Sequence, residues 1–211
     1  ITLIPGETTE LFLTSVATEL KLDKLKLDNN YKKFSKYPEA GIYADTYYVP
    51  YGISEKHLIH FLLSESEKKY EEISNKIYGT YSTMQWANLL IIDSIIQKEA
   101  ANTEEMPLVS SVIYNRLKKG MKLQMDGTLN YGKYSHLKVT PERIRNDKSR
   151  FNTYKYKGLP QSPIGAVSFD AIIAAIKPAK TNYLYFMKNA QGLHDFTQSY
   201  KTHRKNIRKA R

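Results

Sequence analysis

The spacing of apolar residues predicts two consecutive helices near the middle of the chain. In the stretch LLIIDSIIQKEAANTEE, Ile92, Ile95 and Ile96 precede Glu99 by seven, four and three positions. This is helical spacing, so the Glu99 carboxylate shares a face with the isoleucines. A second helix, over PLVSSVIYNRLKKG, has its own apolar stripe and ends at Gly120. A charge at the end of an apolar stripe is costly to bury, which makes Glu99 unusual.

The first third of the chain is expected to combine short β segments with helices. ITLIPGETTELFLTSVATEL indicates a short strand, a turn and a helix, and a lysine-rich helix follows it. AGIYADTYYVPYG is rich in tyrosine and indicates a second β segment. Ser54 is then a suitable N-cap for the long helix EKHLIHFLLSESEKKYEEISNKIYGT. Because this helix is apolar at its start and polar at its end, we interpret it as a connector between two domains, with a boundary near Gly79.

The rest of the chain mixes β, helical and irregular segments. MKLQMDGTLNYG alternates apolar and polar residues, which predicts a strand with a possible Asp-Gly turn. Residues 132–165 contain few periodic signals and predict a long, functional loop. A helix from Ser168 to Lys177, a strand over NYLYFMK, a turn and a basic helix complete the chain. The predicted fold class is α+β.

Length and composition bound the class of protein. A chain of 211 residues can form two modest domains, and a hydrophobic fraction of 41% argues against disorder throughout. Cysteine is absent, which excludes disulfides and cysteine metal sites. No run reaches the roughly 20 apolar residues of a membrane span. Because the chain begins at Ile1 without an initiator methionine, we expect any membrane anchor to lie upstream.

The formal net charge of +11 favours a polyanionic partner such as nucleic acid, an anionic membrane surface or cell wall. In the second half, basic residues are interleaved with tyrosines that could stack on sugars or bases. The terminal KTHRKNIRKAR carries six Lys or Arg and no acid. The sequence alone favours a solvated, frayed helix end over a dedicated binding site for this tail.

Glu99 is the strongest candidate for chemistry. Burial and the negative end of the helix dipole would both raise the pKa of this carboxyl, as a general acid near neutral pH requires. On spacing alone, a glutamate that leaves the core and faces solvent is the favoured alternative. The five histidines lack metal-site spacing, so no metal or other cofactor is expected. Glycine-rich nucleotide motifs and the G-x-S-x-G motif of serine hydrolases are absent from the sequence.

Long blocks of the chain carry a family resemblance. They are SIIQKEAANTEEMPLVSSVIYNRLKKGMKLQMDGTLNYG, FNTYKYKGLPQSPIG and KPAKTNYLYFMKNAQGLHDFT. These blocks resemble the signatures of the endolytic murein transglycosylases, the MltG or YceG-like family. IPGETTELFLTSVATEL and EAGIYADTYYVPYGIS are similar to the LysM-like domain that precedes the catalytic domain there. The resemblance implies a small LysM-like domain over residues 1–52, a linking helix over 53–79 and a mixed α/β catalytic domain over 80–211.

The resemblance implies that Glu99, in QKEA, is the catalytic residue. Substrate-binding roles are implied for residues in the surrounding motifs, namely Asn115, Arg116, Gln124, Asp126, Thr128, Tyr131, Asn152, Thr153, Tyr154, Pro160, His194 and Phe196. The sequence departs from the family pattern where Gln97 replaces a glutamate, DGT replaces D-P-T and GLH replaces G-G-H. Gln97 removes the rival acid of the motif, and the other two changes concern local turn geometry.

Members of this family cleave the β-1,4 bond between N-acetylmuramic acid and N-acetylglucosamine in nascent peptidoglycan without water, leaving a 1,6-anhydro end. The resemblance therefore implies a lyase in which one tuned glutamate suffices, because the substrate supplies its own nucleophile, whereas ordinary glycosidases need two carboxylates. It also implies termination of strand elongation and a position on the periplasmic face of the bacterial inner membrane, held by an N-terminal helix absent from this chain. Peptidoglycan synthases are candidate partners.

Two alternatives stay open from the sequence. A cell-wall-binding scaffold that has lost catalysis is motivated by the DGT and GLH departures. A nucleic-acid-binding protein is motivated by the charge and the aromatic residues, and it gives Glu99 no role.

Overall fold

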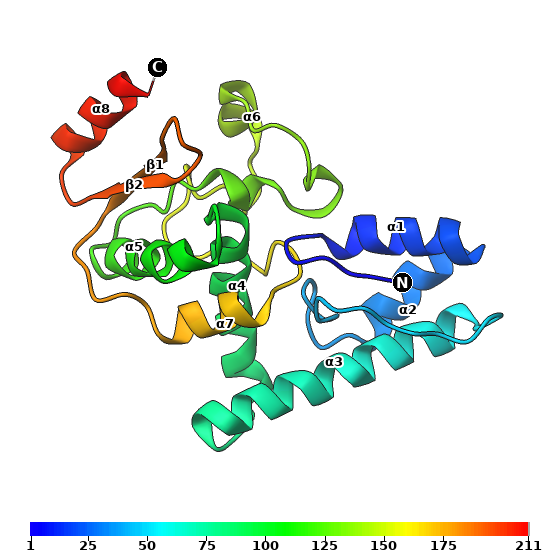
Figure 1. Cartoon of the computed structure of the whole chain (residues 1–211). Helices are drawn as coiled ribbons and strands as arrows, with labels where there is room; N and C mark the ends of the chain where they lie inside the picture. The colour runs from blue at the N-terminus through cyan, green and yellow to red at the C-terminus, as the bar shows by residue number, and fades with distance from the viewer. Residues whose placement is uncertain (211) are drawn as a thin grey trace.

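The computed structural model describes residues 1–210, and Arg211, the last residue of the expected catalytic domain, lies outside the described residues. Within that range the chain is largely helical, with a small antiparallel β-hairpin (Figure 1). The helices are α1 Thr9–Leu20, α2 Lys24–Phe34, α3 Glu55–Tyr78, α4 Thr83–Glu99, α5 Met106–Lys118, α6 Pro141–Asn146, α7 Phe169–Ile176 and α8 Tyr200–Lys209. Short 3-10 helices are η1 Thr103–Glu105, η2 Asp126–Leu129 and η3 Gly132–Tyr134, and the strands are β1 Tyr185–Lys188 and β2 His194–Thr197. The expected mixture of helical and β structure is confirmed.

The N-terminal unit is built around α1, α2 and the first half of α3. Phe12 and Leu13 of α1, Leu27 of α2, and Leu58 and Leu62 of α3 share one buried cluster. Burial of these side chains removes apolar surface from water, which is the main force that holds such short helices together.

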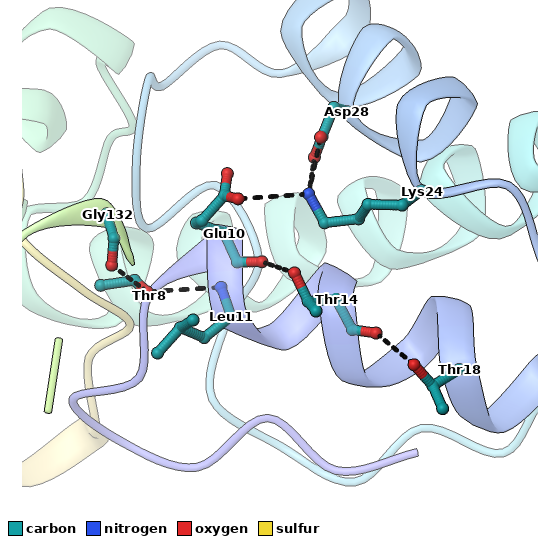
Figure 2. A network of polar contacts seen from close by, with 8 residues as sticks. All are labelled: Thr8, Glu10, Leu11, Thr14, Thr18, Lys24, Asp28 and Gly132. Atoms are coloured by element: carbon teal, nitrogen blue, oxygen red, sulfur yellow. Dashed lines mark hydrogen bonds and ion pairs between the residues drawn. The ribbon is translucent and has the colours of Figure 1, made fainter. Parts of the chain in front are cut away.

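Side-chain caps fix where α1 begins and join it to a distant segment. Thr8 Oγ1 accepts a hydrogen bond from the Leu11 N–H at 3.5 Å and donates to the Gly132 carbonyl oxygen at 2.9 Å (Figure 2). Farther along, Lys24 of α2 pairs with Asp28 at 2.6 Å and lies 3.6 Å from Glu10 of α1. Thr8 therefore both caps α1 and contacts the second half of the chain, while Lys24 joins α2 to α1.

The long helix α3 begins at its Ser54 cap, as predicted. Its second half is not merely a polar connector, because Tyr70 and Ile73 are buried in a cluster with Trp86 and Leu90 of α4. The sequence looks polar there because one residue in three or four is enough to bury a face of a helix. α3 therefore contributes to the cores of both halves of the molecule.

The C-terminal half packs around α4, α5 and α7. Ile95 of α4, Val109 and Ile113 of α5, and Ala171 and Ala174 of α7 belong to one buried cluster. The β1–β2 hairpin packs against this cluster, and α8 lies against the hairpin at the end of the molecule far from α3 (Figure 1). The helix predicted from Ser168 to Lys177 is confirmed as α7, with Ser168 as its N-cap.

The two halves also meet through backbone hydrogen bonds. The Gly6 N–H donates to the Ala166 carbonyl oxygen and the Ala166 N–H donates to the Glu7 carbonyl oxygen, both at 2.7 Å. A Cβ added to Gly165 would lie 2.7 Å from the Gly6 carbonyl oxygen. Only glycine allows the two backbones to approach this closely.

The β segments expected near the N-terminus are wrong as strands. The opening segment and the tyrosine-rich segment meet only at an isolated antiparallel bridge between Thr2 and Thr46. In place of a strand partner, the Tyr43 N–H donates to Ser66 Oγ at 2.9 Å, and the Tyr47 hydroxyl donates to the Tyr43 carbonyl oxygen at 2.7 Å. Side chains from α3 and from the segment itself satisfy the backbone groups that a sheet would otherwise pair.

The strand expected over residues 121–126 is also wrong. Its apolar alternation buries Leu123 and Met125, but Gln124 has a φ of 49°, which interrupts an extended strand. The Gln124 N–H donates to the Thr153 carbonyl oxygen, and Arg116 donates to the Leu123 carbonyl oxygen. The alternation therefore reports one buried face and not a strand.

Two further expectations change. The loop expected over 132–165 contains η3 and α6, and the turn expected before the basic helix is the strand β2. In the part of the chain that the structure describes, no helix has the combination of length and apolar character that crossing a membrane requires.

Candidate active site

α4 delivers Glu99 at its last residue. Ile95 and Ile96 are fully buried, and Glu99, on the same helical face, is half-buried. Glu99 Oε1 accepts a hydrogen bond from the Gly127 N–H at 2.6 Å. The carboxyl is therefore held against the protein, and the alternative of a side chain that extends into solvent is wrong.

The surroundings of Glu99 raise its pKa toward neutrality. Burial raises the pKa of Glu99 to about 7, and the nearby negative charge of Asp126 acts in the same direction. The Gly127 hydrogen bond and the positive charge of Arg116 oppose this shift. Near neutral pH the carboxyl is thus able both to give and to take a proton.

Gly127 is in contact with Glu99 and leaves no room for a side chain. A Cβ at Gly127 would lie 2.7 Å from Glu99 Oε1 and 3.0 Å from Lys98 Cβ. The glycine of the DGT motif thus brings the η2 backbone directly onto the carboxyl.

Asp126 and Tyr154 form a hydrogen-bonded pair beside Glu99. The Tyr154 hydroxyl donates to Asp126 Oδ1 at 2.6 Å. Burial and the Asp126 carboxylate raise the pKa of Tyr154, so the hydroxyl stays protonated and keeps donating. The charge of Glu99 also acts on Tyr154. The structure therefore brings three of the implied site residues, Glu99, Asp126 and Tyr154, into one cluster.

Arg116 of α5 lies near this cluster, and its charge acts on both Glu99 and Tyr154. Its Nε donates to the Leu184 carbonyl oxygen at 2.6 Å, and its Nη1 donates to the Leu123 carbonyl oxygen. The guanidinium carbon lies 5.4 Å from the centre of the Tyr185 ring. These contacts fix a buried cation close enough to Glu99 to lower its pKa.

The FNTY motif braces the DGT turn. The Thr153 and Thr128 hydroxyls are 3.0 Å apart, and Thr153 Oγ1 also accepts from the Met125 N–H at 3.2 Å. The Gln124 N–H donates to the Thr153 carbonyl oxygen at 3.2 Å, while the Gln124 side chain is exposed. Thr128 and Thr153 are buried, so the described contacts give them a supporting position behind the turn.

Asn152 and Tyr131 organise the neighbouring loop. Buried Asn152 donates through Nδ2 to the carbonyl oxygens of Ile144 and Asp147, both at 2.9 Å. The Tyr131 hydroxyl donates to Asp147 Oδ2 at 2.9 Å, and its ring stacks on Phe151 with centres 4.2 Å apart. Both residues thus shape the loop that follows the DGT turn.

Three other implied residues take part in hydrogen bonds or packing within the fold. Asn115 Nδ2 donates to the carbonyl oxygens of Thr181 and Tyr183 at 2.9 and 3.0 Å. Pro160 is buried, and the Phe196 ring lies 5.9 Å from that of Tyr183. None of the hydrogen bonds of Asn115 within residues 1–210 reaches Glu99.

His194 is held by Glu105, which is not among the site residues that the family resemblance implies. His194 Nδ1 lies 2.6 Å from Glu105 Oε2, and the His194 N–H donates to Glu105 Oε1 at 2.8 Å. The Ala101 N–H, two residues beyond Glu99, also donates to Glu105 Oε2, at 3.3 Å. An acid at the start of a helix is ordinary in sequence, so no local signal reveals a partner 89 positions away.

Across residues 1–210 no three His, Asp or Glu side chains come together in a group that could hold a metal ion.

Comparison with known proteins finds relatives of this chain. A model of the YceG-like family matches residues 1–209. An endolytic murein transglycosylase of Bacillus subtilis is 38% identical over 117 residues, which is 56% of this chain and 32% of that protein. One of Streptococcus pneumoniae is 30% identical over 165 residues, which is 74% of this chain and 30% of that protein. The chain therefore spans about a third of the length of these curated relatives.

A solved structure extends the likeness to the fold. The crystal structure of a YceG-like protein of Listeria monocytogenes superposes with a TM-score of 0.80 at 27% identity, covering 97% of this chain and 74% of that one. With a family model that matches nearly every residue, the chain belongs to the YceG-like family.

Proposed function

We propose that this chain cleaves the glycan strands of peptidoglycan by transglycosylation, with Glu99 as the single acid and base. The observation that carries the proposal is the state of Glu99, a carboxyl held on the Gly127 N–H with a pKa of about 7. The names of the relatives, endolytic murein transglycosylases, support the substrate class.

In this mechanism the proton of Glu99 moves twice. Neutral Glu99 donates it to the oxygen that links N-acetylmuramic acid to N-acetylglucosamine, and the bond from the muramoyl C1 to that oxygen breaks. The resulting carboxylate then takes the proton from the muramoyl O6 hydroxyl while O6 bonds to C1 and closes a 1,6-anhydro ring. No water is consumed, and Glu99 returns to its protonated state.

The positions of Asp126 and Arg116 suit this cycle. The Asp126 carboxylate accepts a hydrogen bond from Tyr154, and its charge favours the protonated form of Glu99. Arg116 favours the ionised form that exists between the two proton transfers. A carboxyl balanced between these charges can serve both halves of the reaction, whereas a hydrolase would use a second carboxylate to activate water or attack the sugar.

The N-terminal unit fits a LysM-like glycan-binding role within the same proposal. The Thr2–Thr46 bridge brings together the two extended segments that flank α1 and α2. The family resemblance further supports cleavage of nascent strands, with termination of their elongation. It equally supports a position on the periplasmic face of the inner membrane through a helix outside this chain, with peptidoglycan synthases as neighbours.

The test is a digest of purified sacculi analysed by mass spectrometry, with the chain and its Glu99→Gln variant. We expect anhydro-muropeptides from the unaltered chain and a loss of at least about 10⁴-fold in the variant, since one residue performs both proton transfers. Glu104→Gln is the matched control, because Glu104 is an exposed glutamate on the same connection and should tolerate the change.

Each alternative has a distinct outcome in that digest. Products that end in a free reducing sugar would show that the chain is a hydrolase and not a lyase. Retention on sacculi without any product would favour a non-catalytic scaffold. A folded Glu99→Gln variant that cleaves at the normal rate would remove Glu99 from the mechanism, whereas nucleic-acid binding without any effect on sacculi would favour the remaining alternative.

A further inference from the structure

The last helix, α8, carries a continuous basic face. Lys201, Arg204, Lys205, Arg208 and Lys209 follow one another at spacings of three, one, three and one residues, which places them along one side of a helix. All five are exposed, and no Asp or Glu occurs from residue 196 to the end of the chain. A helix of this length extends the positive charge over about 15 Å.

The opposite face of α8 is anchored, so the helix is not the frayed end that the sequence favours. The rings of Tyr200 and His203 lie 5.6 and 5.3 Å from the ring of Tyr185 in β1. Burial, with the positive charge of Arg116 acting in the same direction, holds the pKa of His203 below its usual value. The inner face is thus largely neutral, and the lysines and arginines of α8 lie on the outer face.

The cations of this face are not used by the fold. None of the ion pairs found in residues 1–210 includes a residue of α8. A surface hollow of about 710 Å³ is bordered by four of these cations, Lys201, Arg204, Lys205 and Arg208, together with Tyr200 and Thr202. Exposed like charges on adjacent turns repel one another, so an anion placed between them relieves that repulsion.

The basic face is connected to the candidate active site by direct contacts. Arg116, whose charge acts on Glu99, packs against Tyr185, and Tyr185 packs against His203 and Tyr200 of α8. Only the hairpin separates the helix from the buried arginine. α8 is therefore linked to Arg116 through a single residue, Tyr185.

We propose that the outer face of α8 is an accessory binding site for the carboxylates of the peptides carried by the glycan strand. The proposal rests on the proposed function, which supplies the polymer. An anionic membrane surface is the less suitable ligand, because a helix that lies on a membrane needs a continuous apolar face, and Tyr200 is the one large apolar side chain exposed on α8 within residues 200–209. Carboxylates need only the exposed cations.

The experiment compares two forms of one substrate. Sacculi are freed of attached phosphate polymers, and half are treated with an amidase that removes the peptides and leaves bare glycan. The variant carries Lys201→Gln, Arg204→Gln, Lys205→Gln and Arg208→Gln, since glutamine keeps helix propensity without charge. The control neutralises four lysines of α3, which lies at the other end of the molecule: Lys56, Lys68, Lys69 and Lys76 (Figure 1). Circular dichroism checks that both variants are folded.

Binding to sacculi and kcat/KM are measured for both forms. We expect the preference of the unaltered chain for peptide-bearing over bare glycan to fall at least about tenfold in the α8 variant, because four exposed charge contacts each add a modest factor. The α3 control should keep the preference. High salt, near 1 M, should reduce the preference of the unaltered chain in the same way.

Other outcomes overturn the proposal. The proposal fails if the preference for peptide-bearing over bare glycan is the same in the unaltered chain and in the α8 variant. It also fails if the α3 control loses this preference as much as the α8 variant does. Binding to vesicles of anionic lipid that depends on α8, together with sacculus binding that does not, would assign the face to a membrane. If the unaltered chain yields no anhydro products, the proposed function fails, yet the sacculus-binding comparison still decides the role of α8.

Discussion

At the scale of single residues, α4 carries two carboxyls with a raised pKa, one with hydrogen-bond partners and one without. Glu99 has the Gly127 N–H and Arg116 beside it, whereas Asp93 is fully buried and neither of its oxygens has a hydrogen-bond partner within residues 1–210. Burial raises the pKa of Asp93 well above its usual value of 3.8. A negative charge on Asp93 would raise the pKa of three tyrosines, Tyr70 and Tyr78 of α3 and Tyr114 of α5. Asp93 is therefore neutral at the pH where it would normally be charged.

We expect Asp93→Asn to flatten the pH dependence of stability. The folded chain keeps a proton on Asp93 that the unfolded chain releases above about pH 4, so the free energy of unfolding falls as pH rises, by up to about 1.4 kcal/mol per pH unit. This loss continues until the pKa of Asp93 in the folded chain is reached. Urea unfolding of the unaltered chain and of the Asp93→Asn variant between about pH 5 and pH 8 measures how the free energy of unfolding of each depends on pH. Glu99 is present in both proteins, so its contribution cancels when the two curves are compared. Parallel curves would show that Asp93 is ionised in the folded protein.

At the scale of elements, the β1–β2 hairpin depends on an acid from another segment. Glu105, at the end of η1, accepts from the backbone and ring of His194 in β2 and from the Ala101 N–H. Burial would raise the pKa of Glu105, but these hydrogen bonds and the charge of His194 hold it below its usual value. Since an isolated two-stranded hairpin is marginally stable, this contact ties it to the connection that follows Glu99.

We expect Glu105→Gln to loosen the hairpin. Glutamine can still accept one backbone hydrogen bond, but it loses the charge that binds His194, at a cost of about 1–3 kcal/mol. Because the pKa of Glu105 is lowered in the folded chain, its contribution is present above about pH 4.5 and is lost as pH falls further. Hydrogen exchange of the hairpin amides, residues 185–197, should accelerate near neutral pH. Exchange as slow as in a Glu104→Gln control would contradict the role of Glu105.

At the scale of the whole molecule, the two halves share too much structure to behave as separate bodies. α3 supplies Leu58 to the N-terminal core and Tyr70 to the cluster around Trp86. Backbone hydrogen bonds between Gly6 and Ala166 add a second connection. Loss of order in one half removes packing from the other, which is the condition for cooperative unfolding.

We expect Leu58→Ala to lower the unfolding midpoint of both halves together. Leu58 is fully buried in the N-terminal core, so the change should cost about 2–5 kcal/mol. Trp86 is the one tryptophan of the chain and reports on the C-terminal side through fluorescence, while far-UV circular dichroism reports on all helices. Equal shifts of the two midpoints indicate one transition. A fluorescence midpoint that does not move would show that the halves unfold independently.

The sequence by itself determined the longer helices and the face on which Glu99 lies, but not the short α6, which it assigned to a loop. Caps such as Ser54 and Ser168 and the isoleucine spacing before Glu99 act over three or four residues, so they are readable without a partner. The family resemblance, and not a local pattern, assigned the DGT and FNTY motifs to the same site as Glu99. Neither motif has a spacing that indicates a carboxyl elsewhere in the chain.

Only the tertiary structure decided which groups surround these helices. The Gly127 N–H on Glu99, the Glu105–His194 pair and the anchoring of α8 on Tyr185 join residues that are distant in sequence. The missing strands have the same origin, since Ser66 and Thr153 side chains satisfy backbone groups that alternation alone assigns to a sheet. A backbone donor takes whichever acceptor packing brings within reach, and packing depends on the whole chain.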